Sequence, residues 1–236
     1  MKHAWVVAWV GLIAATGVAG ADIINGSFDW ASNPLNQWTV IPSFIGTASA
    51  TAVDSYGGQS GVMRLSAETP YVAAPGAWVN QLGFGFYPFV TAMQEVAVSD
   101  GRYAPAGTTA LEFKVAMTFG DQAYLEPPFN DDETPTMELS VLYSSSQGEE
   151  SVFDYILDNR GTWLSRQIEL PDLDVTQPIS IVLRAFADRE PEVSGNVGDT
   201  ATMNLNVYVD EFHFVPEPMS LLLLTAGTGL LLRRRK

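Results

Sequence analysis

The chain has 236 residues, enough for one domain or two small ones, with 12 basic against 27 acidic residues. Residues 22–215 alone contain seven basic and 26 acidic residues, a net charge of −19, which repels phosphate and excludes nucleic-acid binding. The absence of cysteine excludes disulfides, thiolate zinc sites and a thiol nucleophile. With 47% hydrophobic and 11% aromatic residues, the composition is that of a globular protein rather than a disordered one.

The first 21 residues have the pattern of a secretory signal peptide. A basic start is followed by the apolar run 4–15, and the small residues Ala19, Gly20 and Ala21 then form a cleavage site. We predict cleavage between Ala21 and Asp22. The alternative is a permanent membrane helix, which is disfavoured because the run would span only about 18 Å of a hydrocarbon core of roughly 30 Å.

The body of the chain has the pattern of an antiparallel β domain. Short runs rich in Val, Ile, Phe, Tyr and Thr, several of them alternating with polar residues, are separated by Gly, Pro, Asn and Asp. The strands are expected around Trp38, Val62, Trp78 and Val96, over 111–117 and 137–143, around Val152 and Trp163, and over 179–186 and 205–214. The acidic segments 126–135 and 187–200 are predicted surface loops. We therefore predict an all-β fold, a single antiparallel, jelly-roll-like β-sandwich over residues 22–214.

Residues 215–236 form a third segment with three parts. Pro216, Glu217 and Pro218 precede the apolar stretch 219–232, and the basic residues 233–236 follow it. As a helix the stretch would cover about 21 Å, and the basic cluster would stay cytoplasmic by the positive-inside rule. This arrangement predicts a short hydrophobic C-terminal helix, with the β domain on the far side of the membrane.

The tail resembles the PEP-CTERM sorting signal of Gram-negative bacteria, in which an exosortase recognises the Pro-Glu-Pro region and processes the tail. The resemblance implies a protein of the cell surface or of the exopolysaccharide matrix of a biofilm. It would be anchored in the inner membrane as an intermediate, with the exosortase and the secretion machinery as partners. Processing is expected near Pro216, Glu217 and Pro218. An ordinary tail anchor is the alternative.

The body resembles the galactose-binding-like jelly rolls, many of which are carbohydrate-binding modules. Residues 22–29, followed by Trp30 and Trp38, are similar to the opening "N-G-S-F-E" strand of that group, and 208–212 are similar to its closing strand. The resemblance implies a non-catalytic glycan-binding or matrix module with an extracellular polysaccharide as partner. The alternatives are a structural or adhesive surface protein without a small ligand, and a carbohydrate-active enzyme.

Few residues of the body are suited to catalysis. His213 is its only histidine, and its place in an alternating strand favours a structural role. With no cysteine either, a nucleophile–histidine arrangement lacks its components, and we expect no enzyme activity, with paired carboxylates for glycoside hydrolysis as the alternative. Six aromatic residues are available for stacking on sugars, each with burial in the core as the alternative: Tyr71, Trp78, Tyr87, Tyr103, Tyr124 and Trp163. Phe28 and Trp38 are expected in the core.

Calcium is the metal that suits an acidic, exported domain without cysteine. The resemblance to galactose-binding-like jelly rolls implies that Asp29 and Asp210 bind one structural Ca²⁺. In a regular strand, Asp210 would share a face with Phe212 and Phe214, where a cation would compensate its charge. A bulge near Glu211 would instead exchange the faces. The alternative is that both aspartates lie in water at the ends of their strands.

Overall fold

The computed structural model describes the greater part of the predicted β domain. The described residues are 28, 35, 37–83, 86–96, 104, 107–119, 137–156, 161–187 and 195–216, with the backbone alone for 119, 153–156 and 216. The predicted signal peptide, the predicted loop 126–135 and residues 217–236 lie outside this part of the chain. Within the described ranges, no helix is long and apolar enough to cross a membrane.

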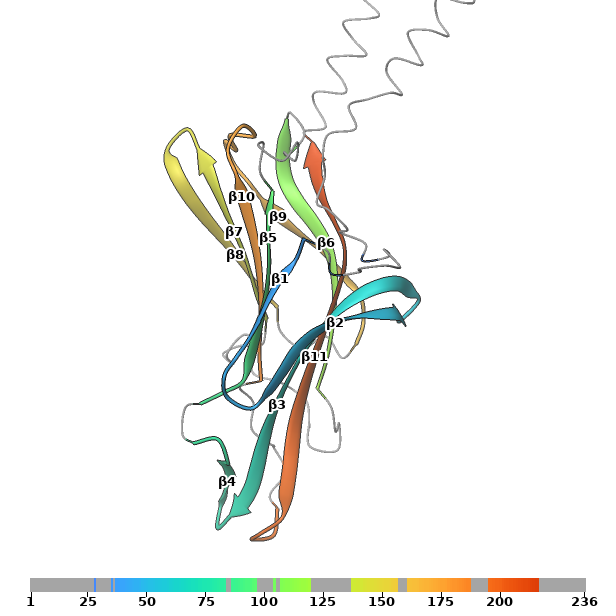
Figure 1. The fold of residues 1–236 in the computed structure, drawn as a ribbon, viewed down its shortest axis with the longest axis vertical. Coiled ribbons are helices and arrows are strands. Elements are labelled where there is room, and N and C mark those ends of the chain that lie inside the picture. The colour runs from blue at the N-terminus through green and yellow to red at the C-terminus, as the bar shows by residue number, and fades with distance from the viewer. Residues whose placement is uncertain are drawn as a thin grey trace, which may run out of the picture.

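Two antiparallel sheets pack face to face (Figure 1). The five-stranded sheet contains, in spatial order, β1 (Thr39–Pro42), β5 (Phe89–Val96), β10 (Ile179–Phe186), β7 (Met137–Ser145) and β8 (Gly148–Ile156). The six-stranded sheet contains β2 (Thr47–Tyr56), β3 (Gln59–Ala74), β11 (Thr200–Pro216), β6 (Thr108–Phe119) and β9 (Leu164–Glu169), with β4 (Ala77–Asn80) paired to the end of β3. After β4, most consecutive strands lie in opposite sheets, as in a jelly roll. The predicted all-β sandwich is confirmed.

Every strand expected from the sequence is present, and one further strand is found. The segment 179–186 is β10 over the same residues, and the other expected runs lie within or beside β1 and β3 to β11. The missed strand is β2, whose sequence is mostly Ala, Ser and Thr and so lacks the large apolar residues that mark a buried face. Ala48 and Ala50 nevertheless pack against the core, where small side chains let β2 lie close to the opposite sheet.

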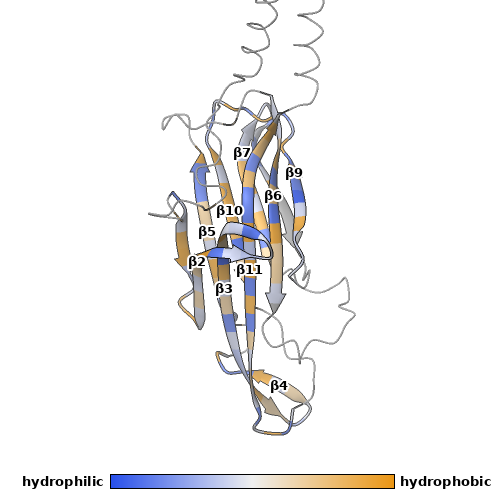
Figure 2. Ribbon diagram, turned by 90° about the vertical axis from the view of Figure 1, so that its right-hand side faces the viewer, coloured by the Kyte–Doolittle hydropathy of each residue, from blue (hydrophilic) through white to orange (hydrophobic). Residues whose placement is uncertain are grey.

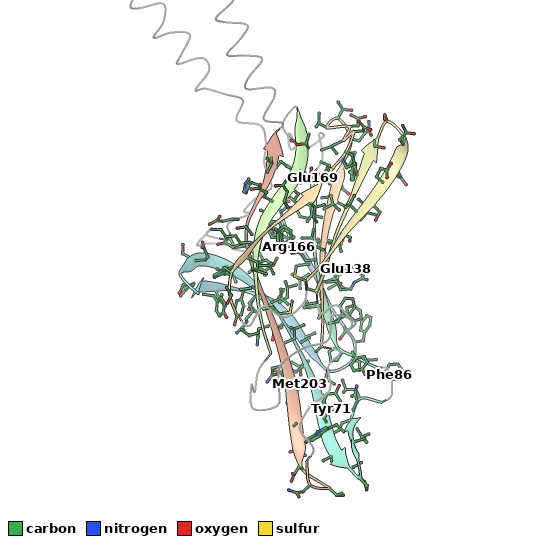
Figure 3. The ribbon with its side chains drawn as sticks, turned by 180° about the vertical axis from the view of Figure 1, so that it is seen from behind. Tyr71, Phe86, Glu138, Arg166, Glu169 and Met203 are labelled. Carbon is green, nitrogen blue, oxygen red and sulfur yellow. The ribbon has the colours of Figure 1, made fainter. Side chains whose placement is uncertain are left out.

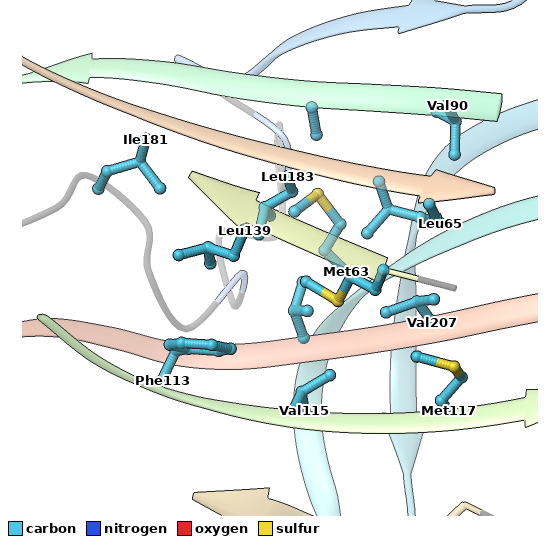
Figure 4. Close-up of a cluster of buried hydrophobic side chains, with 14 of the residues drawn as sticks. Met63, Leu65, Val90, Phe113, Val115, Met117, Leu139, Ile181, Leu183 and Val207 are labelled. Atoms are coloured by element: carbon cyan, nitrogen blue, oxygen red, sulfur yellow. The ribbon is translucent and has the colours of Figure 1, made fainter. Parts of the chain in front are cut away.

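The core is a single layer of side chains between the two sheets (Figure 4). Met63, Leu65 and Phe113 of the six-stranded sheet face Leu139 and Ile181 of the five-stranded sheet, and all five are at most 1% exposed. Hydrophobic and hydrophilic residues alternate along β3 and β11 (Figure 2), because successive side chains of a strand point to opposite faces. Phe28 and Trp38 are buried at 1% and 6% exposure, which confirms their predicted place in the core.

Two strands of the six-stranded sheet continue beyond the sandwich and form an arm. Tyr71 of β3 and Met203 of β11 lie within this arm (Figure 3), and β4 folds back along β3 at its tip. Trp78 of β4 closes this extension, since a side chain at Gly195 would lie within 2.8 Å of its ring. At the opposite end of the molecule, β11 ends at Pro216 (Figure 1).

The last strand extends into the segment predicted as the sorting tail. Val215 pairs with Ala110 and Pro216 with Thr108 of β6, so the six-stranded sheet includes the first two residues after 214. Only Glu217 and Pro218 separate this sheet from the apolar stretch 219–232 in the sequence.

Candidate functional site

The outer face of the five-stranded sheet presents an apolar surface with a polar centre. Along β5 and β10 the inward residues are buried, and the alternate positions, which include Phe89, Met93, Val182 and Phe186, point outward. We call this face the platform and define it by ten residues: Ile41, Phe89, Thr91, Met93, Glu138, Ser140, Leu142, Val182, Arg184 and Phe186. Cross-strand register brings them together over four neighbouring strands.

Two aromatic rings and a guanidinium group form the densest part of the platform. The ring centroids of Phe89 and Phe186 are 6.3 Å apart with an interplanar angle of 43°. The guanidinium carbon of Arg184 lies 5.9 Å from the centroid of Phe186, within cation–π range. Phe89 is 36% exposed, so this cluster presents an aromatic surface to solvent.

The centre of the platform is polar. Arg184 lies opposite Thr91 of β5 and Glu138 of β7. Its Nε is buried and makes no hydrogen bond within the described part of the chain. Thr91 and Ser140 are only 7% and 5% exposed. Each hydroxyl can both donate and accept a hydrogen bond, so with the buried Nε of Arg184 the centre of the platform holds polar groups suited to bonding a ligand.

Exposed apolar side chains continue from the platform onto the adjoining loops. Among the described residues, nine large hydrophobic side chains are markedly exposed, and five of them lie together at this end of the sheet: Ile41, Phe44, Ile45, Phe86 and Phe89. The N–H of Ser43 donates to the carbonyl oxygen of Phe89 at 2.8 Å, which ties the β1–β2 turn to β5. The amide of Asn80 donates to the carbonyl oxygen of Phe86 at 2.7 Å and holds the β4–β5 loop beside it. Figure 3 shows Phe86 on this loop and Glu138 on the sheet.

Most aromatic residues that the sequence offered for sugar stacking have other roles. Tyr71 and Trp78 are buried, while Tyr103 and Tyr124 lie outside the described residues. Tyr87 is half-buried, and Trp163 is half-buried and donates from its indole Nε1 to the carbonyl oxygen of Tyr56 at 3.1 Å.

The sequence did not single out the platform residues. Phe186 falls at the end of the predicted strand 179–186 and Phe89 received no role, although the buried Val90 and Ala185 next to them mark both as outward positions. Once the inward positions of a strand are assigned, a large aromatic residue at an outward position is the signal of an exposed surface.

A second aromatic cluster lies on the outer face of the six-stranded sheet. Tyr56, at the end of β2, stacks on Tyr208 of β11, and its ring centroid is 6.0 Å from that of Trp163. These rings cover one another, so they contribute packing within the protein more than a surface for a ligand. His213 is exposed on this sheet, 3.2 Å from Glu112, at a position where it forms a surface ion pair when protonated.

The bulge considered for Glu211 is present and changes the environment of Asp210. Glu211 has φ 54°, and it and Phe212 together oppose Phe113, so the strand register shifts by one residue. As a result, Phe212 shares the inner face with Val209, and the expectation that Asp210 shares a face with Phe212 is wrong. Asp210 lies opposite Lys114 and is still only 2% exposed.

Its buried carboxylate accepts a hydrogen bond from the N–H of Glu211 at 2.8 Å through Oδ1. No group of three or more His, Asp or Glu side chains able to hold a metal ion occurs among the described residues. Asp29, the other predicted calcium ligand, lies outside them, as do the predicted cleavage residues Ala21 and Asp22 and, in the tail, Glu217 and Pro218. Asp210 therefore remains one candidate oxygen ligand.

No family model and no curated protein matches this chain. Among solved structures, the chain is similar to the carbohydrate-binding module TmCBM61 in complex with β-1,4-galactotriose, at 12% identity and TM-score 0.44, over 83% of this chain and 97% of that one. It is similar to a family 16 carbohydrate-binding module at 17% identity and TM-score 0.39, over 82% and 98% of the two chains. It is also similar to the enzymatically active domain of tailspike protein 4 of bacteriophage CBA120, at 12% identity and TM-score 0.39, over 78% of this chain and 20% of that one.

Proposed function

We propose that this protein is an exported, non-catalytic glycan-binding module of the bacterial cell surface or exopolysaccharide matrix. The observation that carries the proposal is the platform, on which Phe89 and Phe186 lie 6.3 Å apart beside Arg184 and are accompanied by exposed aliphatic side chains. A pyranose ring has an apolar face of C–H groups and a rim of hydroxyl groups. The aromatic rings match the first, and Thr91, Ser140 and Arg184 match the second.

The shape of the platform fits a polymer better than a small buried ligand. It runs across β1, β5, β10 and β7, three intervals of about 4.8 Å between neighbouring strands. Because the surface is open and continues toward Phe44 and Phe86, a chain of several sugar residues can lie across it without being enclosed. Binding of this kind needs no nucleophile or proton donor, in agreement with the expected lack of catalysis.

Glycan-array binding with two platform variants tests the proposal. Phe89→Ala and Phe186→Ala are each expected to weaken binding by about tenfold, or 1.4 kcal/mol, because a stacking surface is lost. Leu164→Ala is the matched control, since Leu164 is a similarly exposed hydrophobic residue on β9 of the other sheet. If folded wild-type protein binds no glycan, or if the two Phe variants bind as the wild type does, the proposal is wrong.

We further propose that an exosortase processes the tail near Pro216, Glu217 and Pro218 after export, so that the membrane-anchored form is an intermediate. Two features support this. The apolar stretch 219–232 would span about 21 Å, a poor permanent fit to a core of roughly 30 Å. The first residue of the motif, Pro216, is also the last paired residue of β11, so little chain separates the domain from the predicted helix. Mass spectrometry of the protein from its native host decides the matter, and a C-terminus that still contains residues 233–236 contradicts it.

A further inference from the structure

The platform lies on a sheet in which acidic side chains outnumber basic ones. Among the described side chains of the five-stranded sheet, Glu95, Glu138, Glu149 and Glu150 are acidic, and Arg184 is the single basic residue. Glu138 is part of the platform, and Glu95 is exposed at the next outward position of β5 after Met93. The potential at the platform is therefore negative, and the net charge of −19 over residues 22–215 adds to it.

The single described basic side chain of this sheet, Arg184, lies beside an aromatic ring and opposite a carboxylate residue. Its guanidinium group lies over Phe186 and opposite Glu138 in the register, and its Nε is buried. A sugar that carries a carboxylate would approach the guanidinium group of Arg184 over Phe186. It would also come close to the carboxylate of Glu138. Like charges brought together in this way reduce both the rate of association and the affinity.

The same features favour a cationic ligand. Aromatic rings attract cations through their negative faces, and the contact of Arg184 with Phe186 shows a cation over one of these rings. Glu138 and Glu95 supply acceptors for ammonium groups, while the hydroxyls of Thr91 and Ser140 can bond to the sugar. Within the proposed glycan-binding function, on which this inference rests, we propose that the platform recognises amino-sugar polysaccharides with free ammonium groups in preference to neutral or uronate-containing polysaccharides.

Three β-1,4-linked hexasaccharides of equal length test this preference: one of glucosamine, one of N-acetylglucosamine and one of glucuronate. Binding of the full-length protein in detergent is measured by calorimetry at one mildly acidic pH, at low and high NaCl. The glucosamine oligomer is expected to bind about tenfold more tightly than the acetylated one at low salt, or 1.4 kcal/mol. This advantage shrinks as salt rises, and the glucuronate oligomer binds most weakly.

Charge variants locate the effect. The double variant Glu95→Gln, Glu138→Gln is expected to reduce the preference for glucosamine to less than threefold. Glu169→Gln with Asp54→Asn, on β9 and β2 of the other sheet, changes the net charge by the same amount and is expected to keep the preference. Equal losses in the two double variants would show that net charge alone is responsible and would overturn the inference, as would tighter binding of the glucuronate oligomer.

The same experiment separates this inference from the proposed function. If the neutral oligomer binds, Phe186→Ala weakens it, and free amines bring no advantage, the glycan-binding function stands and the preference for amino sugars is wrong. If none of the three oligomers binds and a glycan array is also negative, the proposed function itself is wrong.

Discussion

The rings of Tyr56 and Tyr208 stack face to face, with centroids 3.6 Å apart and an interplanar angle of 4°. The strands that carry them are not neighbours, because β3 lies between β2 and β11 in the sheet. The contact forms because the turn of the β2–β3 hairpin curls over the outer face of the six-stranded sheet (Figure 1). The carbonyl oxygen of Tyr56 also accepts a hydrogen bond from the indole Nε1 of Trp163. The β2–β3 hairpin therefore contacts both Tyr208 of β11 and Trp163, which lies just before β9.

The first prediction concerns the two glycines of this turn. Gly57 and Gly58 have φ 55° and 88°, so alanine at either position strains the backbone by about 1–2 kcal/mol. A side chain at Gly57 would also lie 2.7 Å from Nε1 of Trp163, whereas at Gly58 it would meet nothing within 4 Å. Gly57→Ala is therefore expected to lower the free energy of unfolding by roughly 1–3 kcal/mol more than Gly58→Ala. Denaturant unfolding measures both, and equal losses would mean that the hairpin does not pack against Trp163.

A second prediction concerns alkaline pH. Burial, and to a lesser degree the neighbouring Tyr208, raise the pKa of Tyr56 above its ordinary value of about 10. A raised pKa means that the folded state favours the neutral phenol. The resulting stabilisation is fully present below about pH 10 and is lost as the pH rises through the pKa of the folded state. Wild-type protein is expected to lose stability above this pH more steeply than Tyr56→Phe, as measured by denaturant unfolding at a series of pH values. Parallel pH dependences would contradict the assignment.

The third prediction is the calcium site. We expect Ca²⁺ to raise the melting temperature of chelator-treated protein, because an ion bound by Asp29 and Asp210 would stabilise the folded state over the unfolded one. Asp210→Asn and Asp29→Asn should each remove this shift, while the Asn at 210 still offers an oxygen to the N–H of Glu211. Magnesium at the same concentration is the control. An unchanged melting temperature with calcium, or a calcium shift that survives Asp210→Asn, places the site elsewhere or nowhere.

The fourth prediction follows from net charge. At −19 over residues 22–215, the folded domain carries strong self-repulsion at low ionic strength. Added NaCl is expected to raise the melting temperature at neutral pH by screening this repulsion, with most of the effect reached near 0.15 M, where the Debye length is about 8 Å. Thermal melts over a salt series measure it. A melting temperature that falls steadily with added NaCl would show that attractive ion pairs dominate instead.

Patterns carried by neighbouring residues were sufficient to predict the fold class and most strands. Alternation along 179–186 predicted β10 because a strand buried on one face needs an apolar residue at every second position. The same reasoning placed His213 in a strand but did not predict its ion pair with Glu112. It also missed β2, where alanine replaces the large residues that mark a face. The predicted export signal, sorting tail and calcium pair rest on sequence, and most of their residues lie outside the described part of the chain.

The tertiary structure alone decided which aromatic residues meet solvent. Trp78 is buried in part because the segment at Gly195, distant from it in the sequence, closes over its ring. Phe89 and Phe186 form a surface because antiparallel register sets β5 directly against β10. The bulge at Glu211 exchanged the faces of Asp210 and Phe212, which a period of two cannot predict, since one extra residue reverses every side chain beyond it. Sequence periodicity records which residues alternate, whereas pairing between distant strands determines what each face touches.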